Sequence, residues 1–164
     1  MDIFANIRTI VADGACVVGI GNPMRGDDAA GVLVAEALKA AAPDAMIVNA
    51  EDIIESYAFD VAGRNCDNVL LVDAVEAPHA PGSIIFGKFS EMKAASVNFS
   101  THKLSLSLAA DIMEMHGKTV YLLGIVPEST EFGAGVSPAV RRSADIVIEL
   151  LTGCVNDYHK GACV

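Results

Sequence analysis

The stretch VVGIGNPMRGDDAAGVLVAEAL, residues 17–38, indicates the fold of this chain more directly than any other. Its β-branched apolar start predicts a strand that is covered on both faces. The glycines and Asn22-Pro23 predict a tight turn, and Asp27 is the predicted N-cap of a helix that runs to Ala42. Asp28 follows at the point where open α/β sheets bind their ligands. The stretch therefore predicts a strand–turn–helix unit with an acidic residue at a ligand-binding position.

The rest of the chain alternates between strand and helix patterns. The predicted strands are 15–20, 45–50, 68–74, 83–89 and 119–126, with 83–89 towards an edge. The predicted helices are 1–13, 27–42, 51–62, 102–116 and 137–151, with Ser100 and Ser137 as N-caps of the last two and 91–101 as an irregular segment. This alternation predicts one α/β domain over residues 1–164, with a core at 15–152, an N-terminal extension at 1–14 and a C-terminal tail at 153–164. We expect three layers, in which a mostly parallel twisted sheet of about five strands has helices on both faces.

One of these helices has a marked apolar pattern. In the predicted helix 102–116, Leu104, Leu108, Ile112 and Met115 recur at helical spacing. Such a pattern is typical of an amphipathic helix that packs its apolar face on a core.

Composition and charge exclude several classes of function. The formal net charge of −10 counts against binding of nucleic acid and of anionic membranes. Hydrophobic residues make up 52% of the chain, yet no apolar run is long enough for a membrane helix, and the first residues do not resemble a signal peptide. The four cysteines form no CxxC pair, which favours free thiols. We expect a cytoplasmic protein, with a monomer slightly favoured as its oligomeric state.

The glycine-rich turn does not have the pattern of a nucleotide-binding loop. Met24 stands where a dinucleotide fingerprint requires its third glycine, and the Gly-Lys-Ser/Thr ending of a P-loop is absent. Asp27 and Asp28 would place negative charge where a phosphate meets a helix N-terminus. The turn is therefore predicted to attract a cation, with no nucleotide cofactor.

Two further residues complete a candidate cation site. Asp73 ends the otherwise apolar strand 68–74, and in a parallel sheet the ends of the first and third strands can lie side by side, next to Asp28. His102 falls in the first turn of a helix, whose positive end favours the neutral, metal-binding imidazole. Two carboxylates and one imidazole suit zinc or nickel with open coordination positions. The alternative, that each residue only caps a turn or begins a helix, stays open at this level.

Four motifs carry a resemblance to a known family. GIGNPMRGDDAAG (19–31), LLVDAV (70–75), STHKLSL (100–106) and LLGIVPES (122–129) resemble, in this order, those of the nickel–iron hydrogenase maturation proteases. The resemblance covers Cys16 to Leu151. It implies a twisted, mostly parallel sheet flanked by helices, and an endopeptidase that removes the C-terminal extension of the hydrogenase large-subunit precursor after nickel insertion.

The resemblance also implies roles for particular residues. Asp28, Asp73 and His102 would recognise the metal and carry the catalysis. The nickel would be carried by the precursor, and zinc or another divalent ion could substitute for it. Three further residues of the matching motifs are the predicted substrate contacts: Gly21, Asn22 and Glu128.

Two mechanisms and three functions are compatible with these residues. The metal could assist hydrolysis directly, or it could serve only for recognition while a carboxylate acts as general base. No Ser or Cys lies in a nucleophile pattern, which disfavours a covalent route. The alternatives to a protease are a non-cleaving nickel-sensing chaperone for the same precursor and an unrelated nucleotide-binding domain. The loops 76–82 and 129–136 are expected to determine which hydrogenase is served.

Overall fold

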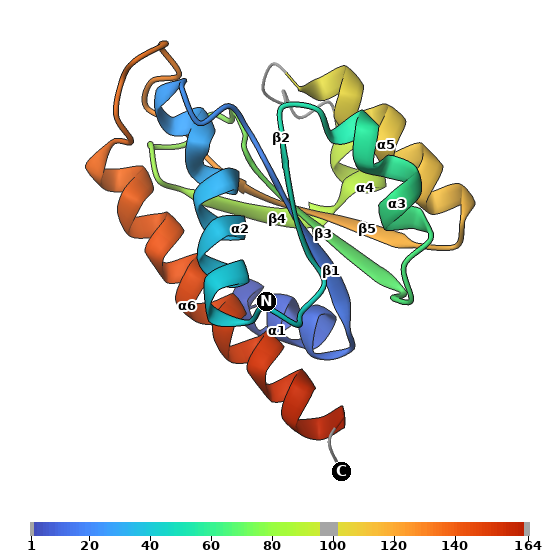
Figure 1. Ribbon diagram of the computed structural model, residues 1–164. Helices are drawn as coiled ribbons and strands as arrows, with labels where there is room; N and C mark the ends of the chain where they lie inside the picture. The colour runs from blue at the N-terminus through green and yellow to red at the C-terminus, as the bar shows by residue number, and fades with distance from the viewer. Residues whose placement is uncertain (1, 96–101, 163–164) are drawn as a thin grey trace.

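A central sheet organises the chain, which is described here from a computed structural model over residues 2–95 and 102–162. The sheet has the strand order β2-β1-β3-β5-β4 (Figure 1). Its strands are Ala15–Ile20 (β1), Ile47–Glu51 (β2), Asn68–Ala74 (β3), Ile84–Lys88 (β4) and Thr119–Ile125 (β5). The first four in this order pair in parallel, and β4 pairs antiparallel with β5 at the edge. The predicted five-stranded, mostly parallel sheet is confirmed.

Helices cover both faces of the sheet and complete the three predicted layers. They are Ile3–Ala12 (α1), Ala30–Ala41 (α2), Ala58–Ala62 (α3), Phe89–Ala94 (α4), Lys103–Met115 (α5) and Pro138–Ala162 (α6), with 3₁₀ turns at Gly26–Ala29 (η1) and Ile54–Tyr57 (η2). Figure 1 shows α1, α2 and α6 on one face and α3, α4 and α5 on the other. None of the helices in the described part of the chain is long and apolar enough to cross a membrane.

Each face of the sheet has its own hydrophobic core. Val17 and Leu70 pack with α1, α2 and α6, whereas Val18 and Leu71 pack with α3 and α5. Consecutive strand residues point to opposite faces, so both faces of a central strand must be apolar. All six residues of β1 are accordingly buried. Gly31 allows α2 to lie directly on this sheet, because a Cβ there would stand 2.2 Å from the Val72 carbonyl oxygen.

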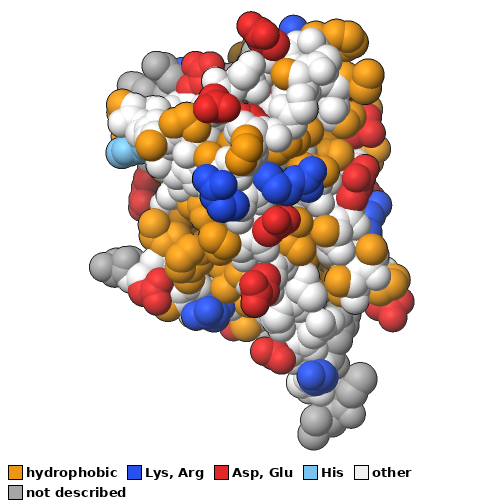
Figure 2. All heavy atoms as spheres, turned by 90° about the vertical axis from the view of Figure 1, so that its left-hand side faces the viewer, with side chains coloured by type: hydrophobic (Ala, Val, Ile, Leu, Met, Phe, Trp, Pro, Cys, Tyr) orange, Lys and Arg blue, Asp and Glu red, His pale blue; other side chains and the backbone are white. Residues whose placement is uncertain are grey.

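The two ends of the chain pack against each other. α6 continues to Ala162, so the prediction that this helix ends at Leu151 is wrong. The additional turns are stabilised because Cys154 and Val155 are buried in the same core cluster as Ile7 of α1. Figure 2 shows this side of the molecule, where hydrophobic side chains gather between charged ones. There a hollow of about 380 Å³ is lined by residues of both helices: Phe4, Arg8, Ile146, Glu149, Leu150, Gly153, Cys154 and Asp157.

The predicted apolar face of α5 is wrong for three of its four residues, and only Ile112 is partly buried against the core. Leu104, Leu108 and Met115 are 84%, 54% and 84% exposed. The helix instead buries a neighbouring stripe: Leu106, Ala109, Ala110 and Met113. The two small alanine side chains in this stripe let the helix approach its neighbours closely, and Leu104 and Leu108 then lie on the exposed side.

Two other segments differ from their predicted structure. The predicted helix 51–62 begins later than expected, since Glu51, whose φ is +49°, is still the last residue of β2. It starts as η2 and continues directly into the short α3. The first part of the irregular segment 91–101 belongs to α4. The rest of that segment, including the predicted N-cap Ser100, lies outside the described residues.

The cysteines of the described region are thiols without disulfide partners, as expected. Cys16 is fully buried in β1, and burial raises the pKa of its thiol to about 12. It therefore remains protonated, which makes it a packing residue and not a nucleophile. Cys163 lies outside the described residues.

Candidate metal centre

The sheet brings two of the predicted acids together at the carboxyl ends of β1 and β3. These two strands pair in parallel from Ala15 with Asn68 to Gly19 with Val72, which confirms that their ends lie side by side. β1 leads through a turn into η1, which carries Asp28, and Asp73 is the last residue but one of β3. The chain leaves β1 towards β2 on one side, and β3 lies on the other side of β1. This is a topological switch point, where open α/β sheets bind ligands.

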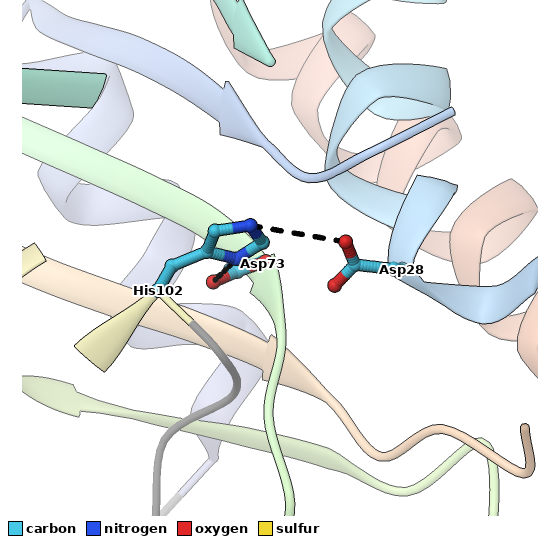
Figure 3. A group of neighbouring side chains, drawn as sticks. All are labelled: Asp28, Asp73 and His102. Atoms are coloured by element: carbon cyan, nitrogen blue, oxygen red, sulfur yellow. Dashed lines mark ion pairs between the residues drawn. The ribbon is translucent and has the colours of Figure 1, made fainter. Parts of the chain in front are cut away.

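His102 lies between the two carboxylates (Figure 3). Its Nε2 is 3.8 Å from Asp28 Oδ2, and its Nδ1 is 3.5 Å from Asp73 Oδ2. One donor atom of each residue falls in a group whose members are all within 4.8 Å of one another. Asp28, Asp73 and His102 are only 3%, 0% and 9% exposed. We call these three residues the triad.

Backbone contacts fix each member of the triad. The Asn22 N–H donates to Asp28 Oδ2 at 2.8 Å, and the Ala74 N–H donates to Asp73 Oδ1 at 2.8 Å. His102 stands immediately before α5, and its carbonyl oxygen accepts from the Leu106 N–H at 2.8 Å. The triad therefore holds its arrangement through the main chain of three separate elements.

The prediction that His102 favours its neutral form is wrong. The pKa of its imidazole is raised above 6.5, chiefly by the hydrogen bond to Asp73 and further by the charges of Asp73, Asp28 and Asp52. Burial acts in the opposite direction and is outweighed. The carboxylates that face the ring therefore affect the pKa of His102 more than the helix terminus, on which the sequence prediction was based. A divalent ion bound by the triad would have to displace the imidazole proton.

The donor set suits a divalent transition metal. Ligand atoms about 2.1 Å from a common ion lie about 3–4 Å apart. One donor atom from each triad residue lies within 4.8 Å of the other two, so a small approach of the side chains would bring all three to one ion. Carboxylate oxygen and imidazole nitrogen together favour ions such as zinc and nickel. Three protein ligands leave coordination positions for groups of a substrate or for water.

The predicted substrate contacts Gly21 and Asn22 have structural roles beside the triad. Gly21 has a φ of +144°, and a Cβ there would stand 1.8 Å from the carbonyl oxygen of Asp28. Asn22 accepts from the Met24 N–H through its side chain at 2.9 Å, in addition to its backbone contact with Asp28. Both residues thus shape the turn that presents Asp28. Their contact with a substrate stays a prediction.

The third predicted substrate contact, Glu128, lies in the segment after β5. Its side chain is exposed, and its backbone N–H donates to Asp27 Oδ2 at 2.8 Å. It borders a cavity of about 310 Å³ between the segments that follow β3 and β5, lined by Glu76, Ala77, His79, Val126, Pro127, Glu128, Ser129 and Thr130. A contact between Glu128 and a substrate stays a prediction.

Asp27 does not cap a helix, contrary to the prediction. No side-chain hydrogen bond caps η1 or α2. The Asp27 carboxylate, 1% exposed, instead accepts from the N–H groups of Glu128 (2.8 Å), Ser129 (3.3 Å) and Ser137 (2.6 Å) and from the Ser137 hydroxyl (2.8 Å). Ser137 does precede α6, as predicted, but its hydroxyl is directed to Asp27. No local pattern reveals this role, because the partners are about a hundred positions away in the sequence.

We predict that Asp27→Asn lowers the free energy of unfolding by about 2–4 kcal/mol. The amide would retain one acceptor oxygen but would direct an NH₂ group at donors now facing Oδ2. Urea unfolding of both proteins at neutral pH measures the difference. Ser137→Ala, which removes one of the four bonds, should cost about 1 kcal/mol. Equal stability of Asp27→Asn and the parent protein would contradict this role.

Comparison with known proteins places the chain in a family. Residues 32–153 match the family model HycI, hydrogenase maturation protease. Over 149 residues the chain is 29% identical to the hydrogenase 2 maturation protease of Escherichia coli (strain K12), covering 86% of this chain and 90% of the relative. It is similar to two solved structures. For the [NiFe] hydrogenase maturation protease HycI of Thermococcus kodakarensis KOD1 the TM-score is 0.76 and the identity 29%, covering 92% of this chain and 99% of the other.

The second solved structure is the hydrogenase maturating endopeptidase HybD of Escherichia coli. Its TM-score is 0.73 and its identity 26%, covering 87% of this chain and 92% of the other. These similarities confirm the predicted family and the predicted α/β fold. The chain therefore belongs to the hydrogenase maturation protease family and is a peptidase.

Proposed function

We propose that this protein removes the C-terminal extension from the nickel–iron hydrogenase large-subunit precursor after nickel insertion, and that it recognises the nickel through Asp28, Asp73 and His102. The observation that carries the proposal is the triad itself: two carboxylates and an imidazole, buried and within 4.8 Å of one another. The family membership supports the peptidase activity and the class of substrate.

In this proposal the nickel ion is part of the substrate. The precursor retains some of its own ligands, and the triad supplies the remainder through its open side. A divalent ion held there would polarise the scissile carbonyl or lower the pKa of a bound water. The chain contributes the fixed positions of its two carboxylates and of the His102 imidazole, whose proton would have to leave when the ring binds the ion. Zinc or another divalent ion with the same ligand preference could take the place of nickel.

Cleavage of nickel-loaded and nickel-free precursor, followed by mass spectrometry, tests this function. We expect loss of the C-terminal peptide from the nickel-loaded precursor only, because the nickel-free precursor offers no metal ion for the triad to bind. Equal cleavage of both forms would exclude nickel recognition. A stable complex whose precursor keeps its full mass would instead indicate a non-cleaving nickel-sensing chaperone.

A further inference from the structure

We propose that two loops beside the triad, residues 22–26 and 127–137, form a docking surface for the precursor, and that their exposed apolar side chains Met24 and Phe132 contact it. We call these two segments the docking loops. The proposal rests on the proposed function, because it names the surface with which the same substrate is held.

The docking loops carry two large apolar side chains that are not buried in either core. Met24 is 57% exposed and Phe132 is 71% exposed. A single exposed apolar residue is common on protein surfaces and needs no explanation. Here two of them occur on loops that contact each other, since the Gly133 N–H donates to the Met24 carbonyl oxygen at 2.8 Å.

The docking loops are held in a fixed arrangement. The buried Asp27 carboxylate binds Glu128, Ser129 and Ser137, and the Asp27 N–H donates to the Ser129 carbonyl oxygen at 2.9 Å. Gly26 lies against the same carbonyl, because a Cβ there would stand 2.5 Å from it. Loops that bind a partner lose less conformational entropy when they are ordered beforehand. The hydrogen bonds of the buried Asp27 carboxylate therefore order residues 127–137 before any partner binds.

The docking loops are continuous with the triad. Residues 22–26 lead directly into the turn that carries Asp28, and the Asn22 N–H binds the Asp28 carboxylate. A folded precursor that presents its metal to Asp28 must therefore bring its own surface against the neighbouring loops. Phe59 of α3 and Met115 of α5, which are also exposed, lie near His116, at the other end of α5 from His102.

The precursor fits this surface better than a second copy of the chain does. Two copies would each carry a net charge of −10 and repel one another. A copy seated on the docking loops would also obstruct the approach to the triad. A partner that delivers a metal to Asp28 has no such conflict.

The test compares two matched double variants of the full-length protein. Met24→Ser with Phe132→Ser changes the docking loops, and Phe59→Ser with Met115→Ser makes the same exchanges at residues 68% and 84% exposed elsewhere. We expect the first variant to bind nickel-loaded precursor about 10- to 100-fold more weakly and to show a raised KM with an unchanged kcat. We expect the control to bind within about twofold of the parent protein. Biolayer interferometry measures the affinity, and unfolding curves confirm that both variants are folded.

The outcomes separate docking from the proposed function. Unchanged affinity of the docking-loop variant, or an equal loss in the control, would overturn the docking surface while leaving the cleavage activity in place. A parent protein that binds the precursor without cutting it would refute the proposed function, and the affinities would still report on docking. A parent protein that does not bind the precursor would overturn both.

Discussion

Replacing His102 by alanine is expected to slow cleavage of the nickel-loaded precursor by about 100-fold or more. His102 supplies the only nitrogen donor of the triad and stands between its two carboxylates. Without it, two buried carboxylates remain as ligands, and the metal of the precursor is bound and oriented less well. Single-turnover cleavage with saturating precursor measures the effect on the reaction step.

His116→Ala is the matched control for this experiment. His116 ends the same helix, is exposed, and its Nδ1 lies 2.8 Å from the Ile112 carbonyl oxygen. Its replacement should leave the cleavage rate unchanged. If His102→Ala is folded and cleaves as fast as the parent protein, the triad is not the site of the reaction.

Nickel affinity should rise with pH by about tenfold per pH unit until the pKa of His102 is reached. The imidazole is protonated below its raised pKa, and one proton must leave when the ring binds a metal. Calorimetric titration of the protein with Ni²⁺ between about pH 6 and pH 8 measures this slope. In His102→Ala the slope should disappear, and an equally steep slope in that variant would contradict the assignment.

The stability of the protein without metal should depend on pH in the opposite sense. The folded-state pKa of His102 lies above its ordinary value of 6.5, so the folded state binds this proton more tightly than the unfolded state. Its contribution to stability is complete below pH 6.5 and is lost as the pH rises through the folded-state pKa. Comparison of parent and His102→Ala unfolding at several pH values isolates this contribution.

The sequence predicted those features of the site that depend on local pattern and on simple rules of topology. Asp73 was identifiable because it interrupts an apolar strand, and the rule for parallel strands placed it beside Asp28. His102 was identifiable from its position at the start of a helix. These features follow from the backbone path, which the alternation of strands and helices predicts.

Other features depend on contacts between distant residues and could not be predicted. The pattern around Asp27 is that of an ordinary N-cap, whereas its carboxylate binds Ser137, 110 positions away. The protonation of His102 depends on two carboxylates that only the folded chain brings to the ring. α5 offers two possible apolar stripes, and only the folded chain shows that the one with Leu106, Ala109, Ala110 and Met113 is buried.

Anomalous X-ray scattering from crystals soaked with Ni²⁺ tests the central role of the triad most directly. We expect one strong peak bounded by Asp28, Asp73 and His102, with ligand atoms at about 2.0–2.2 Å. The same soak of His102→Ala crystals should weaken this peak. A nickel ion bound at full occupancy elsewhere, with no peak between the three side chains, would contradict the account.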